Sequence, residues 1–233
     1  MGLSVVIPVA KDDRSWLVLL PDLVSLGVDD EVIFVSPTPE SQEFRDAIHT
    51  SRLSANTTWI QSAPGRARQL NVGALRSKNE FLWFLHCDSR IGSSAIGALN
   101  LSLISSSHAV LFFNLKFLGD GPALMAVNRV GAFFRSRVLR LPFGDQGLCV
   151  SKEVFERLGK FDETAPYGED HLFVWRAHQT GVPLVCVGQN LFTSARKYKE
   201  RGWSTTTFRH VLLTLKQALP QLAVFLRDRG GER

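Results

Sequence analysis

The stretch Phe81-Leu82-Trp83-Phe84-Leu85-His86-Cys87-Asp88-Ser89 decides the fold. Its first part is continuously apolar, as expected of a strand that is buried on both faces of a parallel sheet. Its polar residues follow at the carboxyl end, where open α/β sheets bind their ligands. The carboxylate of Asp88 at that edge suits Mg²⁺ or Mn²⁺ bridging to a diphosphate. A turn in which Asp88 bonds its own backbone is the alternative.

Further short apolar runs alternate with helical patterns on both sides of this stretch. This alternation predicts an α/β fold with a largely parallel sheet. The expected strands are 3–7, 31–36, 57–62, 81–86, 109–117 and 183–187. Helices are expected from about Asp13, at Pro39 with Thr38 as the cap, after Ser151, and from Glu169 to Gly181. With no linker or repeat, we expect one domain over 1–233, with a nucleotide-sugar half at about 1–90 and an acceptor half at about 91–233.

The composition sets limits on the class of protein. Of 233 residues, 27 are Lys or Arg and 22 are Asp or Glu, so the net charge of +5 favours anionic partners without choosing among them. The hydrophobic content of 45% excludes a disordered chain. Cys87, Cys149 and Cys186 are far apart, which argues against a disulfide framework or zinc site and for a reducing compartment. Without a signal peptide or spanning segment, we expect a cytoplasmic protein.

Three more motifs carry groups suited to chemistry. Pro64 to Ala74 reads as a glycine-containing loop entering a helix, where Arg66 and Arg68 could cradle a phosphate, although a solvated basic face is equally compatible. Gly144-Asp145-Gln146-Gly147 precedes a short strand, and Gly168-Glu169-Asp170 begins a helix. A carboxylate at such a place is either a helix-dipole partner or a general base. A later basic cluster, which includes Arg196 and Lys197, could close over a diphosphate.

The segment 205–227 repeats apolar residues every three to four positions. Pro220 should kink or divide this helix. The simpler expectation is a helix that packs its apolar stripe on the sheet. The other is an interfacial helix that brings the site to a lipid-linked acceptor at the inner face of the membrane. With Arg209, Lys216 and Arg227 as its cations, such membrane contact would be weak and salt-sensitive.

Taken in this order, the motifs resemble glycosyltransferase family 2, whose members have the GT-A fold. Leu3 to Pro8 resembles the first strand of that family, and Arg68 to Ala74 its nucleotide-contacting helix start. Phe84 to Ser89 resembles its D-x-D metal motif, and Gly168-Glu169-Asp170 its E-D motif. The nearest pattern is that of a short bacterial subgroup, the radical-SAM/selenodomain-associated family 2 glycosyltransferases. Over nearly the whole chain, it shares the segments Gly65 to Ala74, Phe84 to Ser89, Gly144 to Gln146 and Thr193 to Lys197.

The resemblance implies a GT-A fold: a Rossmann-like three-layer sandwich with a mainly parallel mixed sheet. It also implies an inverting, metal-dependent transfer of a sugar from a nucleotide-diphosphate-sugar donor to an unknown acceptor hydroxyl, with no nucleic-acid partner. Asp170 would be the catalytic base, supported by Glu169, and Asp88 would hold Mg²⁺ or Mn²⁺ with His86 beside it. The other implied site residues are Pro8, Arg66, Arg68 and Asn71 for the donor, and Asp145, Gln146, Arg196 and Lys197 on the acceptor and diphosphate side.

The chain also departs from the family pattern. Ser36 stands where the family has an aspartate that holds the nucleoside, Lys11-Asp12-Asp13 replaces a common Asn-Glu pair, and His86 replaces the first Asp of D-x-D. Two alternatives therefore stay open. One is a nucleotidyltransferase of related fold, although Pro8-Val9-Ala10-Lys11 lacks the glycine-rich loop such an enzyme needs. The other is an inactive nucleotide-binding or membrane-edge module.

Overall fold

The computed structural model describes residues 2–53 and 55–230. Within these residues, eight strands form one mixed sheet in the order β3-β2-β1-β4-β7-β6-β8-β5. Neighbours from β3 to β4 are parallel, as are β6 and β8, whereas β7 is antiparallel to both β4 and β6, and β5 to β8. The strands are β1 (Leu3–Pro8), β2 (Glu31–Ser36), β3 (Asn56–Gln61), β4 (Phe81–Phe84), β5 (Arg90–Ile91), β6 (Val110–Phe117), β7 (Cys149–Ser151) and β8 (Leu184–Thr193).

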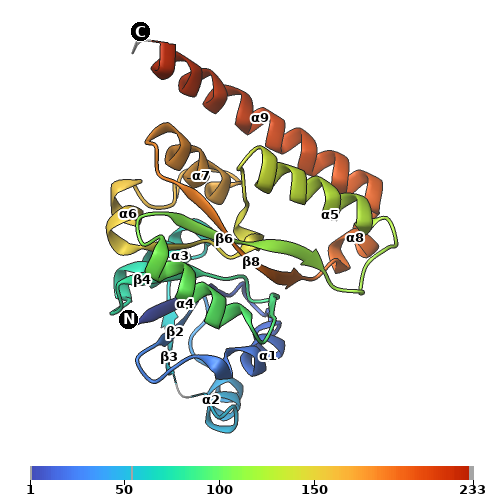
Figure 1. Cartoon of the computed structure of the whole chain (residues 1–233). Coiled ribbons are helices and arrows are strands. Elements are labelled where there is room, and N and C mark those ends of the chain that lie inside the picture. The colour runs from blue at the N-terminus through green and yellow to red at the C-terminus, as the bar shows by residue number, and fades with distance from the viewer. Residues whose placement is uncertain (1, 54, 231–233) are drawn as a thin grey trace.

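Helices cover both faces of the sheet, which gives three layers (Figure 1). One buried cluster joins the sheet to α1, η1, α2 and α4, and a second joins it to α3, α6 and α7. The helices are α1 (Trp16–Leu19), η1 (Leu20–Ser25), α2 (Gln42–Thr50), α3 (Arg66–Arg76), α4 (Ala95–Ser105), α5 (Met125–Phe133), η2 (Phe134–Val138), η3 (Gly144–Gln146), α6 (Lys152–Arg157), α7 (Glu169–Gln179), α8 (Arg196–Arg201) and α9 (Trp203–Gly230). No helix in the described ranges has both the length and the apolarity needed to cross a bilayer.

Two contacts fix the start of α3 at the carboxyl ends of β1 and β2. A Cβ added to Gly73 would lie 2.3 Å from Cγ1 of Val6, so only glycine lets α3 approach β1 this closely. The Gln69 side chain donates hydrogen bonds to the carbonyl oxygens of Val9 (2.8 Å) and Val35 (2.7 Å). Because α3 is tied down at both points, its first residue, Arg66, lies at the ligand edge of the sheet.

Most predicted elements are confirmed, but the start of α2 differs. Helix α2 begins at Gln42, and its cap is Ser41, whose Oγ accepts from the N–H of Phe44 (3.1 Å). The prediction that Thr38 caps this helix is therefore wrong: Thr38 lies in the preceding loop and bonds to Ser36. Ser151 caps α6 as predicted, accepting from the N–H of Val154.

The C-terminal segment differs more. Helix α9 is one element that passes through Pro220, so of the two expected effects of this proline, a kink or a division, the division is wrong. Pro220 and Lys216 are both exposed, so the carbonyl that loses its helical donor can bond to water. The expected packing of the apolar stripe on the sheet is also wrong, because Phe208 and Leu219 are exposed. Instead α9 packs on α7 and α8 and runs beside α5 (Figure 1). The side chain of Asn128 on α5 accepts a hydrogen bond from Trp203 and donates one to Thr207, both on α9.

Candidate active site

Four segments that are distant in sequence meet at the carboxyl end of β4. They are the second residue after the strand (His86), the first residue of α3 (Arg66), the first turn of α7 (Glu169 and Asp170) and the start of η3 (Gly144). The Arg66 guanidinium contacts Glu169 and His86, and it lies 4.0 Å from Oδ2 of Asp170. The structure therefore brings together Arg66, His86, Glu169 and Asp170, which the sequence placed in three separate motifs.

Asp170 is held as a carboxylate. Its side chain is only 13% exposed, and it accepts hydrogen bonds from the N–H groups of Gly144 and His171. Burial by itself raises the pKa of Asp170, but the charge of Arg66 and the N–H of Gly144 outweigh burial, so the pKa lies below its ordinary value. The group is therefore ionised at neutral pH, as a proton acceptor must be.

Arg66 is positively charged and His86 is neutral in this arrangement. Burial lowers the pKa of Arg66, but Asp170 and Glu169 outweigh it and raise the pKa overall. Burial, helped by the charge of Arg66, lowers the pKa of His86 to about 3, so this imidazole is neutral. Because an arginine can only donate, Nε2 of His86 accepts from Arg66. That nitrogen is thus not available to a metal in this arrangement.

The glycine and aspartate of η3 lie beside Asp170. A Cβ on Gly144 would lie 2.5 Å from Nη2 of Arg66 and 2.7 Å from Oδ2 of Asp170, so a larger residue would break this contact. The neighbouring Asp145 has a buried Oδ1 that has no hydrogen-bond partner among the residues that the structure describes. Burial raises the pKa of Asp145 to about 6, against the opposing charge of Arg135. An unbonded carboxylate oxygen beside Asp170 can receive a hydroxyl of a ligand.

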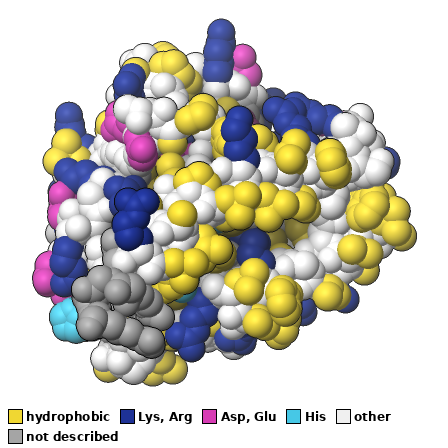
Figure 2. Space-filling view, turned by 90° about the horizontal axis from the view of Figure 1, so that it is seen from above, with side chains coloured by type: hydrophobic (Ala, Val, Ile, Leu, Met, Phe, Trp, Pro, Cys, Tyr) yellow, Lys and Arg dark blue, Asp and Glu magenta, His cyan; other side chains and the backbone are white. Residues whose placement is uncertain are grey.

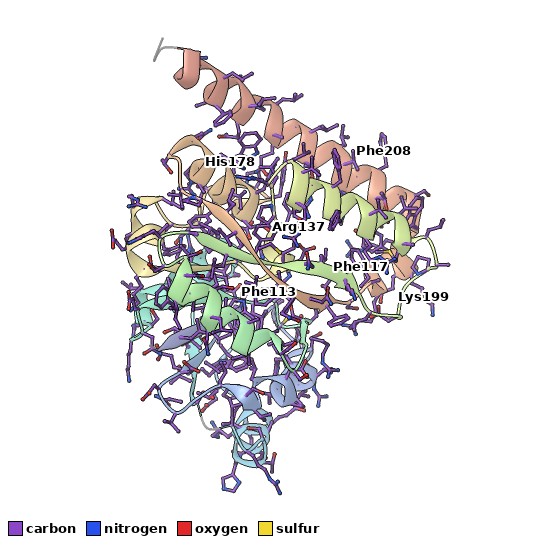
Figure 3. The ribbon with its side chains drawn as sticks, in the orientation of Figure 1. Phe113, Phe117, Arg137, His178, Lys199 and Phe208 are labelled. Atoms are coloured by element: carbon purple, nitrogen blue, oxygen red, sulfur yellow. The ribbon has the colours of Figure 1, made fainter. Side chains whose placement is uncertain are left out.

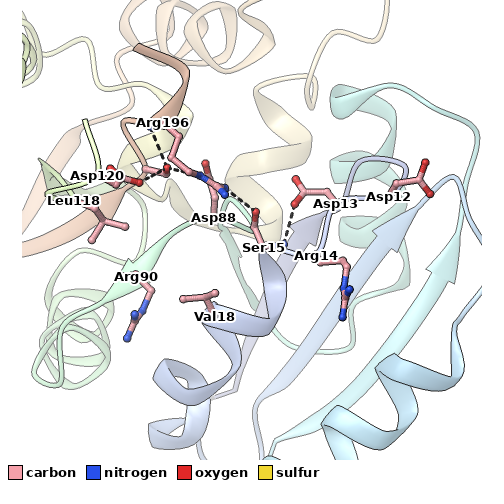
Figure 4. Close-up of a pocket in the computed structure, with 11 residues that line it drawn as sticks. Asp12, Asp13, Arg14, Ser15, Val18, Asp88, Arg90, Leu118, Asp120 and Arg196 are labelled. Atoms are coloured by element: carbon pink, nitrogen blue, oxygen red, sulfur yellow. Dashed lines mark hydrogen bonds between the residues drawn. The ribbon is translucent and has the colours of Figure 1, made fainter. Parts of the chain in front are cut away.

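Three pockets that share lining residues lie near the ends of β1 and β4. A pocket of about 200 Å³ contains Pro8, Arg66, His86, Asp88 and Lys197 in its lining. It shares Asp13 and Asp88 with a pocket of about 540 Å³, in whose lining Arg196 donates to Ser15 (Figure 4). It shares Asp13 with a third pocket of about 400 Å³, which is lined in part by Trp16, Thr38 and Trp59. The volumes and the mixture of aromatic, acidic and basic side chains suit a nucleotide.

The side chains near the end of β4 could hold a divalent cation that takes few of its ligands from the protein. Among the described residues, no three His, Cys, Asp or Glu side chains cluster closely enough to hold a metal alone. Asp88 and Asp13, however, line the same two pockets, and burial raises the pKa of Asp88 despite the opposing charge of Lys197. Mg²⁺ is typically held by one or two carboxylates together with phosphates and water. The carboxylates therefore fit such an ion, and His86 does not.

Other predicted site residues are engaged elsewhere. The Asn71 side chain bonds to the backbone N–H and carbonyl oxygen of Phe161. Asn71 and Arg68 both donate to the carboxylate of Glu163. Neither Asn71 nor Arg68 lines any of the three pockets. Gln146 is fully buried and donates to the carbonyl oxygen of Phe113. These three side chains stabilise the loops around the site. Ser36 is also fully buried, and Thr38 faces the third pocket in its place.

Sequence reasoning missed several residues of the site. Asp13, which lines all three pockets, was visible only as part of a departure from the family pattern. Trp59 gave no signal, because an aromatic residue in a strand is most simply explained as core. Arg135 was also missed; it lies 3.2 Å above the Phe143 ring, within a π-helical turn, a feature common at functional sites.

Comparison with known proteins gives a fold likeness. No family model and no curated protein matches the chain. TarS from S. aureus with UDP-GlcNAc superposes with a TM-score of 0.63 at 17% identity, over 83% of this chain and 58% of that one. A second TarS structure gives 0.65 at 15% identity, over 83% and 37%. The mannosyltransferase PcManGT from Pyrobaculum calidifontis, in complex with GDP-Man and Mn²⁺, gives 0.70 at 14% identity, over 97% and 68%.

These structural neighbours are glycosyltransferases, and this chain spans little more than a third to about two thirds of their lengths. At such identities the likeness shows the architecture. The predicted fold class is thereby confirmed: this chain has a GT-A-like α/β fold.

Proposed function

We propose that this protein transfers a sugar from a nucleotide-diphosphate-sugar donor to an acceptor hydroxyl with inversion. One observation carries the proposal: Arg66, which lies 4.0 Å from Asp170, lines a pocket at the end of β4 that shares lining residues with two larger pockets. The sequence motifs support placing the chain in family 2, near the radical-SAM/selenodomain-associated subgroup. The UDP-GlcNAc and GDP-Man complexes of the structural neighbours support a nucleotide sugar as donor.

In the proposed reaction, the acceptor oxygen attacks the anomeric carbon while its proton passes to the carboxylate of Asp170. The bond between the anomeric carbon and the diphosphate oxygen breaks, and the nucleoside diphosphate leaves with the electron pair. Arg66 holds Glu169 and keeps Asp170 ionised, so Glu169 is a positioning residue. Asp145 receives an acceptor hydroxyl, and Lys197 and Arg196 stabilise the departing diphosphate from the pocket walls.

Asp88, with Asp13, would hold Mg²⁺ or Mn²⁺ against the diphosphate. Such an ion neutralises charge that develops on the leaving group. Pro8 lies in the same pocket wall, at the end of β1. The proposal places this reaction in a reducing cytoplasm, with an acceptor that is reached at the inner face of the membrane.

Calorimetric titration with UDP and GDP, each with and without Mn²⁺, tests the donor site. The intact protein should bind one of them more tightly with Mn²⁺. Asp88→Asn should lose this metal-dependent gain, whereas Asp46→Asn, a matched change on exposed α2, should keep it. Equal metal dependence in the Asp88 variant would contradict the assignment. Binding without any transfer would instead favour an inactive nucleotide-binding module.

A further inference from the structure

Helices α5 and α9 present large apolar side chains to solvent. Phe208 is 70% exposed and projects outward from α9, and Val130 on α5 is 64% exposed (Figure 3). Their exposed neighbours repeat at helical spacing on both helices and in η2. We call this surface the α5–α9 face; its residues are Val127, Val130, Phe133, Phe134, Phe208, Leu212, Leu215 and Leu219. Monomeric soluble proteins rarely leave so much contiguous apolar surface in water.

The charges on this face have one sign. Residues 122–139 and 201–227 contain no Asp or Glu. The exposed cations of these two segments are Arg129, Arg137, Arg201, Arg209, Lys216 and Arg227, and the adjoining α8 adds three more cations and one exposed acid, Glu200. Figure 2, seen from above, shows hydrophobic side chains in an extended patch with Lys and Arg around it. Apolar side chains among many cations, with Glu200 as the one exposed acid of these segments, match the interface of an anionic bilayer.

A groove connects the face to the candidate site. It has a volume of about 370 Å³ and lies between α5 and α9, with Val127, Val211 and Leu215 in its lining. Asp145 and Arg135 line the same groove. Asp145 follows Gly144, whose N–H holds Asp170. The groove therefore leads from the exposed apolar surface to the acceptor side of the base.

We propose that the α5–α9 face docks on an anionic lipid bilayer, so that the groove opens toward the membrane. A second copy of the chain is a poorer occupant, because two faces with such a large excess of cations would repel each other. We further infer, resting on the proposed function, that the acceptor is an amphipathic molecule of the membrane. Its apolar chain lies in the groove, and its hydroxyl reaches Asp145.

Co-sedimentation with vesicles tests the docking without any donor or acceptor. The intact chain should sediment with vesicles of phosphatidylglycerol and phosphatidylcholine, and at least tenfold less with phosphatidylcholine alone. The double change Phe208→Ser with Leu212→Ser should reduce binding at least tenfold. The matched control is Leu101→Ser with Ile104→Ser on α4, which lies apart from α9 and whose two residues are each 71% exposed (Figure 1).

A second pair of variants tests the charges. Arg209→Glu with Lys216→Glu should lower binding at least tenfold, whereas Arg76→Glu with Lys78→Glu, the same change in net charge at exposed positions remote from the face, should lower it far less. Thermal unfolding checks that each variant is folded. If the variant with the two apolar changes is unfolded, the variant with the two charge changes decides the test.

Three results would overturn the proposal. The first is no binding of the intact chain to anionic vesicles at low salt. The second is equal loss in the face and control variants. The third is a dimer, measured by light scattering, that the Phe208 and Leu212 changes dissociate while vesicles are not bound. None of these results depends on transfer activity, so failure of the proposed function would be seen separately.

Discussion

Asp170 and Asp145 are two carboxylates of one site whose surroundings push their pKa values in opposite directions. Arg66 and the N–H of Gly144 overcome burial at Asp170 and lower its pKa, whereas burial dominates at Asp145 and raises its pKa to about 6. Such divergent pairs are typical of sites that handle protons. The cost is stability, because a buried carboxylate with an unbonded oxygen is unfavourable when ionised.

Asp145→Asn should therefore stabilise the protein in a pH-dependent way. The pKa of this carboxyl is raised on folding, so the folded state is penalised when the group ionises, above about pH 6, and not below about pH 4. The gain in unfolding free energy should reach roughly 1–3 kcal/mol at pH 8 and shrink toward pH 4. Urea unfolding at both pH values measures it. An equal difference at the two pH values would mean that Asp145 ionises normally.

At the scale of elements, close packing of α3 on β1 delivers Arg66 to the site. Gly73→Ala should cost about 1–3 kcal/mol, because the new Cβ would lie 2.3 Å from the side chain of Val6. Gly97→Ala in α4 is the matched control: its Cβ would meet nothing within 4 Å, so helix propensity should make it neutral or stabilising. Thermal unfolding compares the two. Equal melting temperatures would show that α3 can move away from β1 at no cost.

The corrected start of α2 gives a second prediction at this scale. Ser41→Ala removes the hydroxyl that caps the N–H of Phe44 and should cost about 1 kcal/mol. Thr38→Ala should cost clearly less, since Thr38 makes no cap and its carbonyl oxygen still accepts from Trp59. Urea titration of both variants distinguishes the two positions. A larger loss at Thr38 would contradict the observed boundary.

The elements show what a sequence can and cannot predict. Continuous apolar strands such as β4 were predicted because burial on both faces leaves a local pattern. The contact between Arg66 and His86 was not, because it joins residues brought together only by the tertiary fold. Asn71 looked like a donor ligand, yet the loop at Phe161 occupies its side chain. The stripe of α9 predicted a helix but not what covers it, since periodicity records one apolar face and not its partner.

At the scale of the molecule, the candidate site can be reached from two sides, through the pockets and through the groove. The three pockets share Asp13, in the loop after β1, and the smallest of them reaches α3, whereas the groove between α5 and α9 is lined also by residues of β6 and η3. Arg66, Asp170 and Asp145 lie where the two meet. This arrangement suits a reaction between a polar nucleotide sugar and a less polar acceptor.

The most direct test of this account is the release of nucleoside diphosphate from UDP-GlcNAc and GDP-mannose, with water in the acceptor's place. The intact protein should release UDP or GDP from one of them. Asp170→Asn should lower that rate by a factor on the order of 10²–10⁴, as loss of a general base does, while its affinity for the same nucleotide stays within about twofold. Full activity in Asp170→Asn, or no release by the intact protein from either donor, would contradict the central claim.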